Sequence, residues 1–196
     1  MLRFMDYVRI NKGSTMDLND LVKQIDALES SPPFELWNPP NCGDIDMVIK
    51  SDGSWWYMGT PITREKLVKL FSTVLIKENA NYFLKTPAEK IGIKVEDAPF
   101  IITDWQTLKT NKEDAIQVIS NLGHKAILSS THPLTINNEE TQQAKLYVEL
   151  HRGLKAKVHR NVYYQWINTA QEKTIEGVTH LGIFSGRTFF SMGAID

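Results

Sequence analysis

Cysteine is almost missing from this sequence, and its scarcity excludes two kinds of structure. Cys42 is the single cysteine among 196 residues, so no disulfide can form within the chain and a four-cysteine zinc site is impossible. The formal net charge is also close to balanced, at -1, so no overall field selects nucleic acid or an anionic membrane as a partner. This cysteine usage favours a reducing, cytoplasmic compartment.

Long hydrophobic runs are missing as well. A membrane helix needs about 20 apolar residues in succession, and none occurs. Near the N-terminus Arg3, Asp6 and Arg9 interrupt any apolar stretch that a signal peptide would require. We therefore expect no membrane span, and we interpret residues 1–15 as a leader to the fold. Hydrophobic residues make up 42% and charged residues 23% of the chain, which allows a globular core.

The pattern of apolar residues predicts an α+β protein. Helical spacing predicts helices over 16–29, over 64–77 and from Arg160 onward. The pair Asp52-Gly53 lies between two β-favouring runs and predicts a tight hairpin over 44–62. Further strands are expected near 81–86, 91–95, 99–105, 115–120, 124–130 and 133–137, in alternating stretches after residue 146, and in a closing hairpin over 179–194.

The order of these features indicates an internal duplication. Each half has a strand, a glycine turn (Gly53, Gly153), a second strand, an arginine (Arg64, Arg160) and a helix. A polar stretch over 106–114 separates the halves. We therefore expect two related lobes of antiparallel strands, each with a packed helix, over 16–106 and 107–196. Duplicated lobes that pack face to face leave a cleft, which is a common place for ligands.

Three stretches of this sequence resemble a known bacterial family. They are WNPPNCGDIDMVIKSDGSWWYMGTPITREKLVKLF (37–71), TPAEKIGIKVEDAPF (86–100) and RGLKAKVHRNVYY (152–164). Their pattern closely resembles domain-of-unknown-function family 1285, over nearly the whole chain after Met16. The motifs are long and unusual, so the resemblance is specific.

The resemblance implies a fold and a kind of ligand, but no reaction. Members of the family look like a duplicated two-lobe core whose C-terminal lobe superficially resembles pleckstrin-homology-like folds. The resemblance further implies a nucleotide-like ligand at the lobe interface and a role in signalling. No reaction or cofactor is carried over from the family, and residues 1–15 fall outside the match.

Three arginines are the candidate anion-binding residues. If 148–160 formed one pleated segment, Arg152 and Arg160 would share a face with apolar side chains, where a guanidinium needs a partner. Arginine also binds phosphate and carboxylate in a forked geometry. The alternatives are a break at Gly153, an ion pair within the protein, or Arg160 simply starting a helix. Arg64 opens a predicted helix, where a phosphate would gain from free N–H groups, although such an arginine is often just exposed.

Aromatic residues are the candidates for stacking on a ligand. Trp55, Trp56 and Tyr57 are consecutive, so on a strand they face both sides. Trp56 is the first candidate for stacking on a base or ring, and Trp37 on the preceding loop is the second. We include Tyr57 in the predicted ligand set. For most of these aromatics, packing in a core is the commoner role.

Signatures of catalysis and of metal binding are missing. Asp44 and Asp46 share a strand face and suit Mg²⁺, but two carboxylates are a weak signal. The five histidines are scattered, and His151 and His159 are about 26 Å apart if the chain between them is extended. We predict no catalytic residue, no metal site and no cofactor, which counts against an enzyme without deciding the question.

Three functions remain open from the sequence. The first is a ligand-binding or signalling protein for an anionic, nucleotide-like small molecule, held by Arg64, Arg152 and Arg160. The second is a protein-interaction module that uses an apolar patch of the closing hairpin at Phe184, Phe189 and Phe190. The third is a metal-assisted phosphohydrolase built on Asp44 and Asp46. Nucleic acid and membranes are not expected partners.

Overall fold

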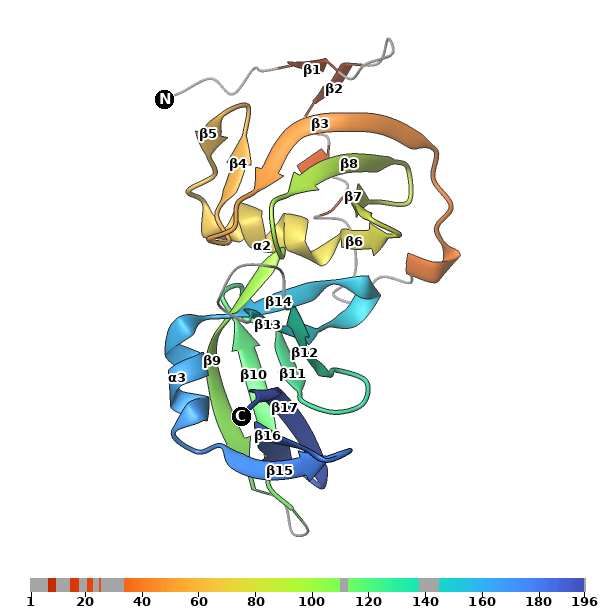
Figure 1. Ribbon diagram of the computed structural model, residues 1–196. Coiled ribbons are helices and arrows are strands. Elements are labelled where there is room, and N and C mark those ends of the chain that lie inside the picture. The colour runs from red at the N-terminus through yellow and green to blue at the C-terminus, as the bar shows by residue number, and fades with distance from the viewer. Residues whose placement is uncertain are drawn as a thin grey trace. The chain divides into compact units, whose positions relative to one another are not determined.

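The structure is a computed structural model that describes residues 7–9, 15–17, 21–22, 25, 34–109, 113–137 and 145–195. The chain divides into two compact units, Met1–Asp97 and Ala98–Asp196 (Figure 1). This division lies ahead of the boundary predicted after residue 106. The reason is that β9 (Phe100–Leu108) is one continuous strand, so the polar stretch that begins at 106 continues a strand of the second unit.

The first unit is built on a six-stranded sheet. Its strand order is β5-β4-β3-β8-β7-β6, and the central pair β3–β8 is parallel while the other pairs are antiparallel. The Asp52-Gly53 turn joins β3 to β4, which confirms the predicted hairpin. The elements are the 3-10 helix η1 (Phe34–Leu36), β3 (Asn41–Ile49), β4 (Trp55–Tyr57), β5 (Thr60–Pro61), α2 (Glu65–Thr73), β6 (Leu75–Glu78), β7 (Asn81–Lys85) and β8 (Lys90–Val95).

Alternation along the strands builds the core of this unit. Ile45, Met47 and Ile49 of β3 are buried, while the residues between them lie on the outer face of the sheet. The helix α2 packs on the buried face, where Phe71 stacks against Trp55 with ring centroids 6.2 Å apart. Both of these side chains are almost fully buried.

The predicted helix over 64–77 is too long. It ends at Thr73, and Leu75–Glu78 forms β6, which pairs with β7. Leu75 and Ile76 are apolar and continue the helical spacing, so the periodicity of the sequence does not mark the change. The cross-strand partners Leu84 and Phe83 decide it instead, because they pair with Leu75 and Ile76 in the sheet.

The second unit contains another six-stranded sheet, of order β11-β10-β9-β14-β13-β12, in which the central pair β9–β14 is parallel. After this sheet come a helix and a three-stranded antiparallel sheet of order β15-β16-β17. The remaining elements are β10 (Ala115–Ser120), β11 (Lys125–Ile127), β12 (Leu134–Asn137), β13 (Lys145–Glu149), η2 (His151–Gly153), β14 (Lys155–Val158), α3 (Arg160–Ile167), β15 (Gln171–Ile175), β16 (Val178–Ser185) and β17 (Thr188–Ala194).

The two six-stranded sheets share one topology. Each sheet consists of two three-stranded meanders, β3–β5 and β6–β8 in the first unit and β9–β11 and β12–β14 in the second. The two meanders of a sheet are joined by a parallel pair, which is β3 with β8 in the first unit and β9 with β14 in the second. The order of elements therefore agrees with duplication. However, the alignment of Gly53 with Gly153 pairs non-equivalent turns, because Gly53 joins the first two strands of its sheet and Gly153 the last two of its own. The helices also differ, since α2 joins the two meanders and α3 follows the second.

The helix α3 and the last sheet complete the second unit. Val162 and Trp166, one helical turn apart, are the buried residues of α3, which contacts β9 and β16 and lies along β9 in Figure 1. Trp105 of β9 donates from its indole nitrogen to Gln165 at 2.7 Å. In the last sheet Phe190 is buried, whereas Phe184 is 37% exposed and faces the outside with Phe189.

The N-terminal region is described only in part. Tyr7–Arg9 (β1) pairs with Thr15–Asp17 (β2). Of the helix predicted over 16–29, Leu21, Val22 and Ile25 are helical, and Leu21 and Ile25 are buried. The other residues of that prediction from 18 on lie outside the described part, so the N-terminal helix is not confirmed as a whole. Across the described residues, no helix combines the length and apolar character needed to span a bilayer.

Candidate functional site

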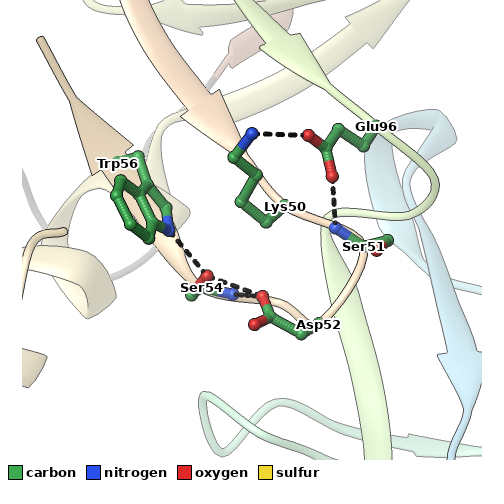
Figure 2. A network of polar contacts seen from close by, with 6 residues as sticks. All are labelled: Lys50, Ser51, Asp52, Ser54, Trp56 and Glu96. Atoms are coloured by element: carbon green, nitrogen blue, oxygen red, sulfur yellow. Dashed lines mark hydrogen bonds and ion pairs between the residues drawn. The ribbon is translucent and has the colours of Figure 1, made fainter. Parts of the chain in front are cut away.

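A polar network fixes Trp56 on the outer face of the first sheet (Figure 2). Its indole nitrogen donates to the hydroxyl of Ser54 at 2.9 Å, and that hydroxyl donates to Asp52 at 2.6 Å. The hydrogen bond from the Ser54 hydroxyl, and a second from the Ser54 backbone N–H at 2.9 Å, hold the pKa of Asp52 below its ordinary value. The half-buried ring lies between its cross-strand neighbours Val48 and Pro61. Its position is therefore preset by the hairpin.

The same figure shows how the hairpin is tied to β8. Lys50 forms an ion pair with Glu96 at 2.7 Å, and the backbone N–H of Ser51 donates to the other oxygen of that carboxylate at 3.0 Å. The hydrogen bond from Lys50 is the main reason that the pKa of Glu96 is lowered. Because both partners of the ion pair are about 40% exposed, the contact orients the turn more than it stabilises the fold.

The other candidates of the first unit lie on three different elements. Tyr57 is buried and faces the core, opposite to Trp56, as consecutive strand residues must. Trp37 packs against Phe34, with ring centroids 4.9 Å apart. Arg64 is exposed and occupies the N-cap position of α2. Tyr57 therefore cannot share a stacking surface with Trp56.

Arg152 and Arg160 lie at opposite ends of β14. The pleated segment expected over 148–160 is interrupted by η2, where Arg152 has φ 58° and ψ 32°. The alternative interpretation, a break in the strand at Gly153, is therefore correct. The four residues of β14 then separate the two arginines, by about 10 Å along the strand alone. Arg160 begins α3, and its guanidinium donates to the Tyr164 hydroxyl at 3.2 Å.

Three turns of the second unit bring His124 and His132 near His151, which contacts Arg152. His124 ends the turn from β10 to β11, where the Ser120 hydroxyl accepts from its backbone N–H at 3.0 Å. His132 lies in the turn from β11 to β12, and its Nδ1 is 3.1 Å from the carbonyl oxygen of Glu149. His151 begins the turn from β13 to β14. We call His124, His132, His151 and Arg152 the His–Arg cluster.

The contact between His151 and Arg152 is a hydrogen bond for one protonation state of the imidazole. Nη2 of Arg152 lies 2.5 Å from Nε2 of His151. A guanidinium only donates, so Nε2 must be an acceptor and His151 must be neutral, with its proton on Nδ1. The His151 ring also meets the ring of His124, with centroids 5.8 Å apart. His124 in turn packs edge-on against Phe100 at 4.8 Å.

The electrostatics of the cluster are those of a positive site. Desolvation lowers the pKa of His151 to about 4, helped by the charges of Arg152, His124 and His132. Burial, followed by the charge of Arg152, also lowers the pKa of His124. Although His151 is exposed, the neighbouring groups Arg152, His124 and His132 all disfavour a positive charge on its ring. Such a site attracts an anion.

The backbone of this turn is unusual in the same place. Arg152 adopts the left-handed conformation and is followed by Gly153 with φ 69°. A non-glycine residue in that region costs of order 1 kcal/mol, and such residues occur often at ligand sites. In this conformation the Arg152 side chain contacts His151. In a regular strand the side chains of these two consecutive residues would point to opposite faces.

The sequence did not reveal this cluster. Read along the chain, His124, His132 and His151 are scattered, and their convergence depends on the pairing of β13 with both β12 and β14. One signal was present, since each histidine lies beside a turn residue, in Gly123-His124, His132-Pro133 and His151-Arg152-Gly153. Asp44 and Asp46 both lie on the outer face of β3. Within the described ranges, no three or more His, Cys, Asp or Glu residues are arranged to hold a metal ion.

Comparison with known proteins gives a family but no activity. No curated protein matches the chain. A crystal structure of a DUF1285 family protein from Silicibacter pomeroyi is 33% identical and covers 89% of this chain and 95% of its own, with a TM-score of 0.78. A second, from Shewanella baltica, is 30% identical and covers 62% of this chain and 90% of its own, with a TM-score of 0.51.

Family models cover almost all of the chain beyond residue 31. Residues 32–98 match the N-terminal domain of the domain of unknown function DUF1285. Residues 99–192 match the C-terminal domain of the protein of unknown function DUF1285. The two matches meet close to the division between the two units. The chain therefore belongs to the DUF1285 family.

Proposed function

We propose that this protein binds an anionic small molecule and acts as a ligand-binding, signalling protein. The His–Arg cluster of the second unit is the binding site in this proposal. The observation that carries it is the gathering of Arg152 and three imidazoles from three separate turns, with Nη2 of Arg152 2.5 Å from Nε2 of His151. Arginine is suited to phosphate and carboxylate, so we expect a ligand that carries one of these groups.

A nucleotide-like ligand remains the more specific form of the proposal. In that form the ligand carries a base or ring in addition to its anionic group, and the base would contribute stacking on an aromatic side chain. A phosphate group alone would need only the His–Arg cluster. A panel that compares sulfate, pyrophosphate, mononucleotides and dinucleotides therefore separates the two forms, because only the nucleotide-like form predicts that the base adds affinity.

We also propose that the fold of the second unit is similar to pleckstrin-homology domains. The support is a mostly antiparallel sheet followed directly by one helix, α3, that packs on its strand β9. The parallel pair β9–β14 is a departure from that likeness. A cytoplasmic location is also proposed, on the single cysteine of the chain.

The direct test is a thermal-shift measurement with this panel on the protein and two arginine variants. A ligand at about one hundred times its dissociation constant stabilises by about 2.7 kcal/mol, a shift of about 5–10 °C for a chain of this size. We expect Arg152→Met to abolish the shift. Arg160→Met is the matched control, because Arg160 lies at the other end of β14, and it should keep the shift.

Two outcomes would contradict the proposal. One is the absence of any shift across the panel. The other is an equal loss of the shift in Arg152→Met and Arg160→Met, because a site confined to the His–Arg cluster leaves Arg160 outside. Circular dichroism of each variant confirms that the fold is intact before the shifts are compared.

A second candidate function, protein interaction, is favoured by one observation. Phe184 and Phe189 lie together on the outer face of the last sheet, and Ile175 and Val178 at its far end are 38% and 48% exposed. With a second copy of the chain as the partner, the weight-average mass should rise with concentration in sedimentation experiments, and Phe184→Asp should prevent this. A mass that stays monomeric at all concentrations would rule this form out.

A further inference from the structure

We infer that anion binding at the His–Arg cluster is coupled to the uptake of a proton by His151. The inference rests on the proposed function and deepens it, because it states how the same site is regulated. It starts from the contact between Arg152 and His151, in which the guanidinium occupies the Nε2 acceptor of a neutral imidazole. In this state Arg152 directs one of its donors at His151.

An anion at Arg152 competes for that donor. When an anionic oxygen accepts from Nη2, Nε2 of His151 loses the hydrogen bond that it accepted. Its lone pair then faces an anion, which is unfavourable for a neutral acceptor. A proton on Nε2 converts the ring into a second donor to the same anion, so that the repulsion becomes a charge-assisted hydrogen bond. The proton comes from solvent and no bond other than N–H is formed.

The surroundings of His151 make the coupling strong. Arg152 from its own turn, His124 from the β10–β11 turn and His132 from the β11–β12 turn all act against a positive charge on the free ring. On the flanking strands, Glu149 and Lys155 form an ion pair with each other at 3.3 Å. The pKa of His151 is therefore low before binding. An anion beside the ring offsets the repulsion, of which Arg152 contributes the largest part, and raises this pKa toward, or above, the ordinary value of about 6.5.

The consequence is a ligand affinity that depends on pH. Where the free ring is neutral and the bound ring is protonated, each unit of pH increase weakens binding by about tenfold. The ligand would therefore bind more tightly in a mildly acidic solution than in a neutral one.

Sulfate is the probe that tests this, because its own charge does not change between pH 5 and 8. We would measure sulfate binding by isothermal titration calorimetry at pH 5.5, 6.5 and 7.5, in two buffers of different ionisation enthalpy. The expected result is a weaker binding constant at each higher pH and a heat that depends on the buffer, which reports up to one proton taken up per sulfate. His151→Gln keeps an acceptor for Arg152 but cannot take a proton, so its binding should be weaker and independent of pH.

The outcomes separate this inference from the proposed function. If sulfate does not bind at any pH, the proposed anion site fails and the inference fails with it. If sulfate binds equally at all three pH values with no dependence on the buffer, the anion site stands and the inference is wrong. Nitrogen-detected NMR of the His151 ring needs no variant. It should show the Nδ1–H tautomer in the free protein at pH 6.5 and an imidazolium after sulfate is added, and an unchanged tautomer would also overturn the inference.

Discussion

The hydroxyl of Ser185 joins the last sheet to the six-stranded sheet of the second unit. It donates to the backbone carbonyl oxygen of Leu128 at 2.7 Å and accepts from the backbone N–H of Ile116 at 3.0 Å, in a buried position. One side chain thus satisfies two backbone groups that are distant from it in the sequence, one in β10 and one directly after β11.

We therefore expect Ser185→Ala to be strongly destabilising. The alanine fits the space but leaves a buried N–H and a buried C=O without their partner, at about 1–3 kcal/mol for each group. The measurement is urea unfolding followed by far-ultraviolet circular dichroism. Thr188→Ala, on the exposed end of the same hairpin, is the control and should change the free energy of unfolding by less than about 0.5 kcal/mol. Equal effects of the two variants would contradict this role of Ser185.

Much of the fold could be predicted where the pattern of residues is local. The Asp52-Gly53 hairpin, the strands over 81–85 and 115–120, and the start of α3 at Arg160 all follow from turn residues and alternation. The strand β15 could not be predicted, because Gln171–Ile175 is exposed along its whole length and has no apolar face. Its pairing with β16 decides its conformation.

The candidate site also contains residues that could be predicted from the sequence and residues that could not. Arg152 was identified because a charged residue stood within an apolar alternation. Its histidine neighbours were not, because they are brought together by strand pairing and not by spacing in the chain. The assumption of one unbroken strand over 148–160 also failed, since the turn η2, in which Arg152 and Gly153 have positive φ, ends β13 and returns the chain antiparallel to it as β14. No residue pattern other than the following glycine marks that change.

The Ser54 hydroxyl is expected to control both the orientation of Trp56 and the titration of Asp52. Ser54→Ala removes the hydrogen bonds to Asp52 and from Trp56, so the pKa of Asp52 should rise toward its ordinary value and stability should fall by about 0.5–1.5 kcal/mol. Carboxyl chemical shifts measured against pH report the first effect. Ser51→Ala is the matched control, because only the backbone N–H of Ser51 takes part in this network. An unchanged Asp52 titration in Ser54→Ala would contradict the cause that we assign.

Trp166 is expected to be the anchor of α3. Its side chain is fully buried and meets Trp105 of β9 edge-on, with centroids 6.3 Å apart. Trp166→Ala should destabilise the second unit by about 3–5 kcal/mol through the cavity that it leaves. Within the described part of the chain the buried indole nitrogen has no hydrogen-bond acceptor, so Trp166→Phe should cost much less. Thermal unfolding of both variants checks this, and similar losses for the two would argue against an unsatisfied indole.

Acid should destabilise the second unit through His151. In the unfolded chain this histidine binds its proton near pH 6.5, whereas in the native state its pKa is about 4. Between these two values unfolding therefore takes up a proton, and the free energy of unfolding falls as the pH is lowered from about 7 toward 4. The slope for one proton is at most about 1.4 kcal/mol per pH unit, and the exposed edge of the ring makes it smaller here.

The variant His151→Gln isolates this contribution. Glutamine keeps an acceptor beside Arg152 and does not titrate, so the variant should be less sensitive to pH between 7 and 5. The carboxylates whose pKa is lowered, Asp52 and Glu96, lose their stabilising charge only below about pH 4.5, outside this window. Urea unfolding at pH 7, 6 and 5 measures the difference. If the protein and His151→Gln lose stability in parallel over this range, His151 does not carry a lowered pKa in the native state, and the positive potential that supports the anion site would lose its main support.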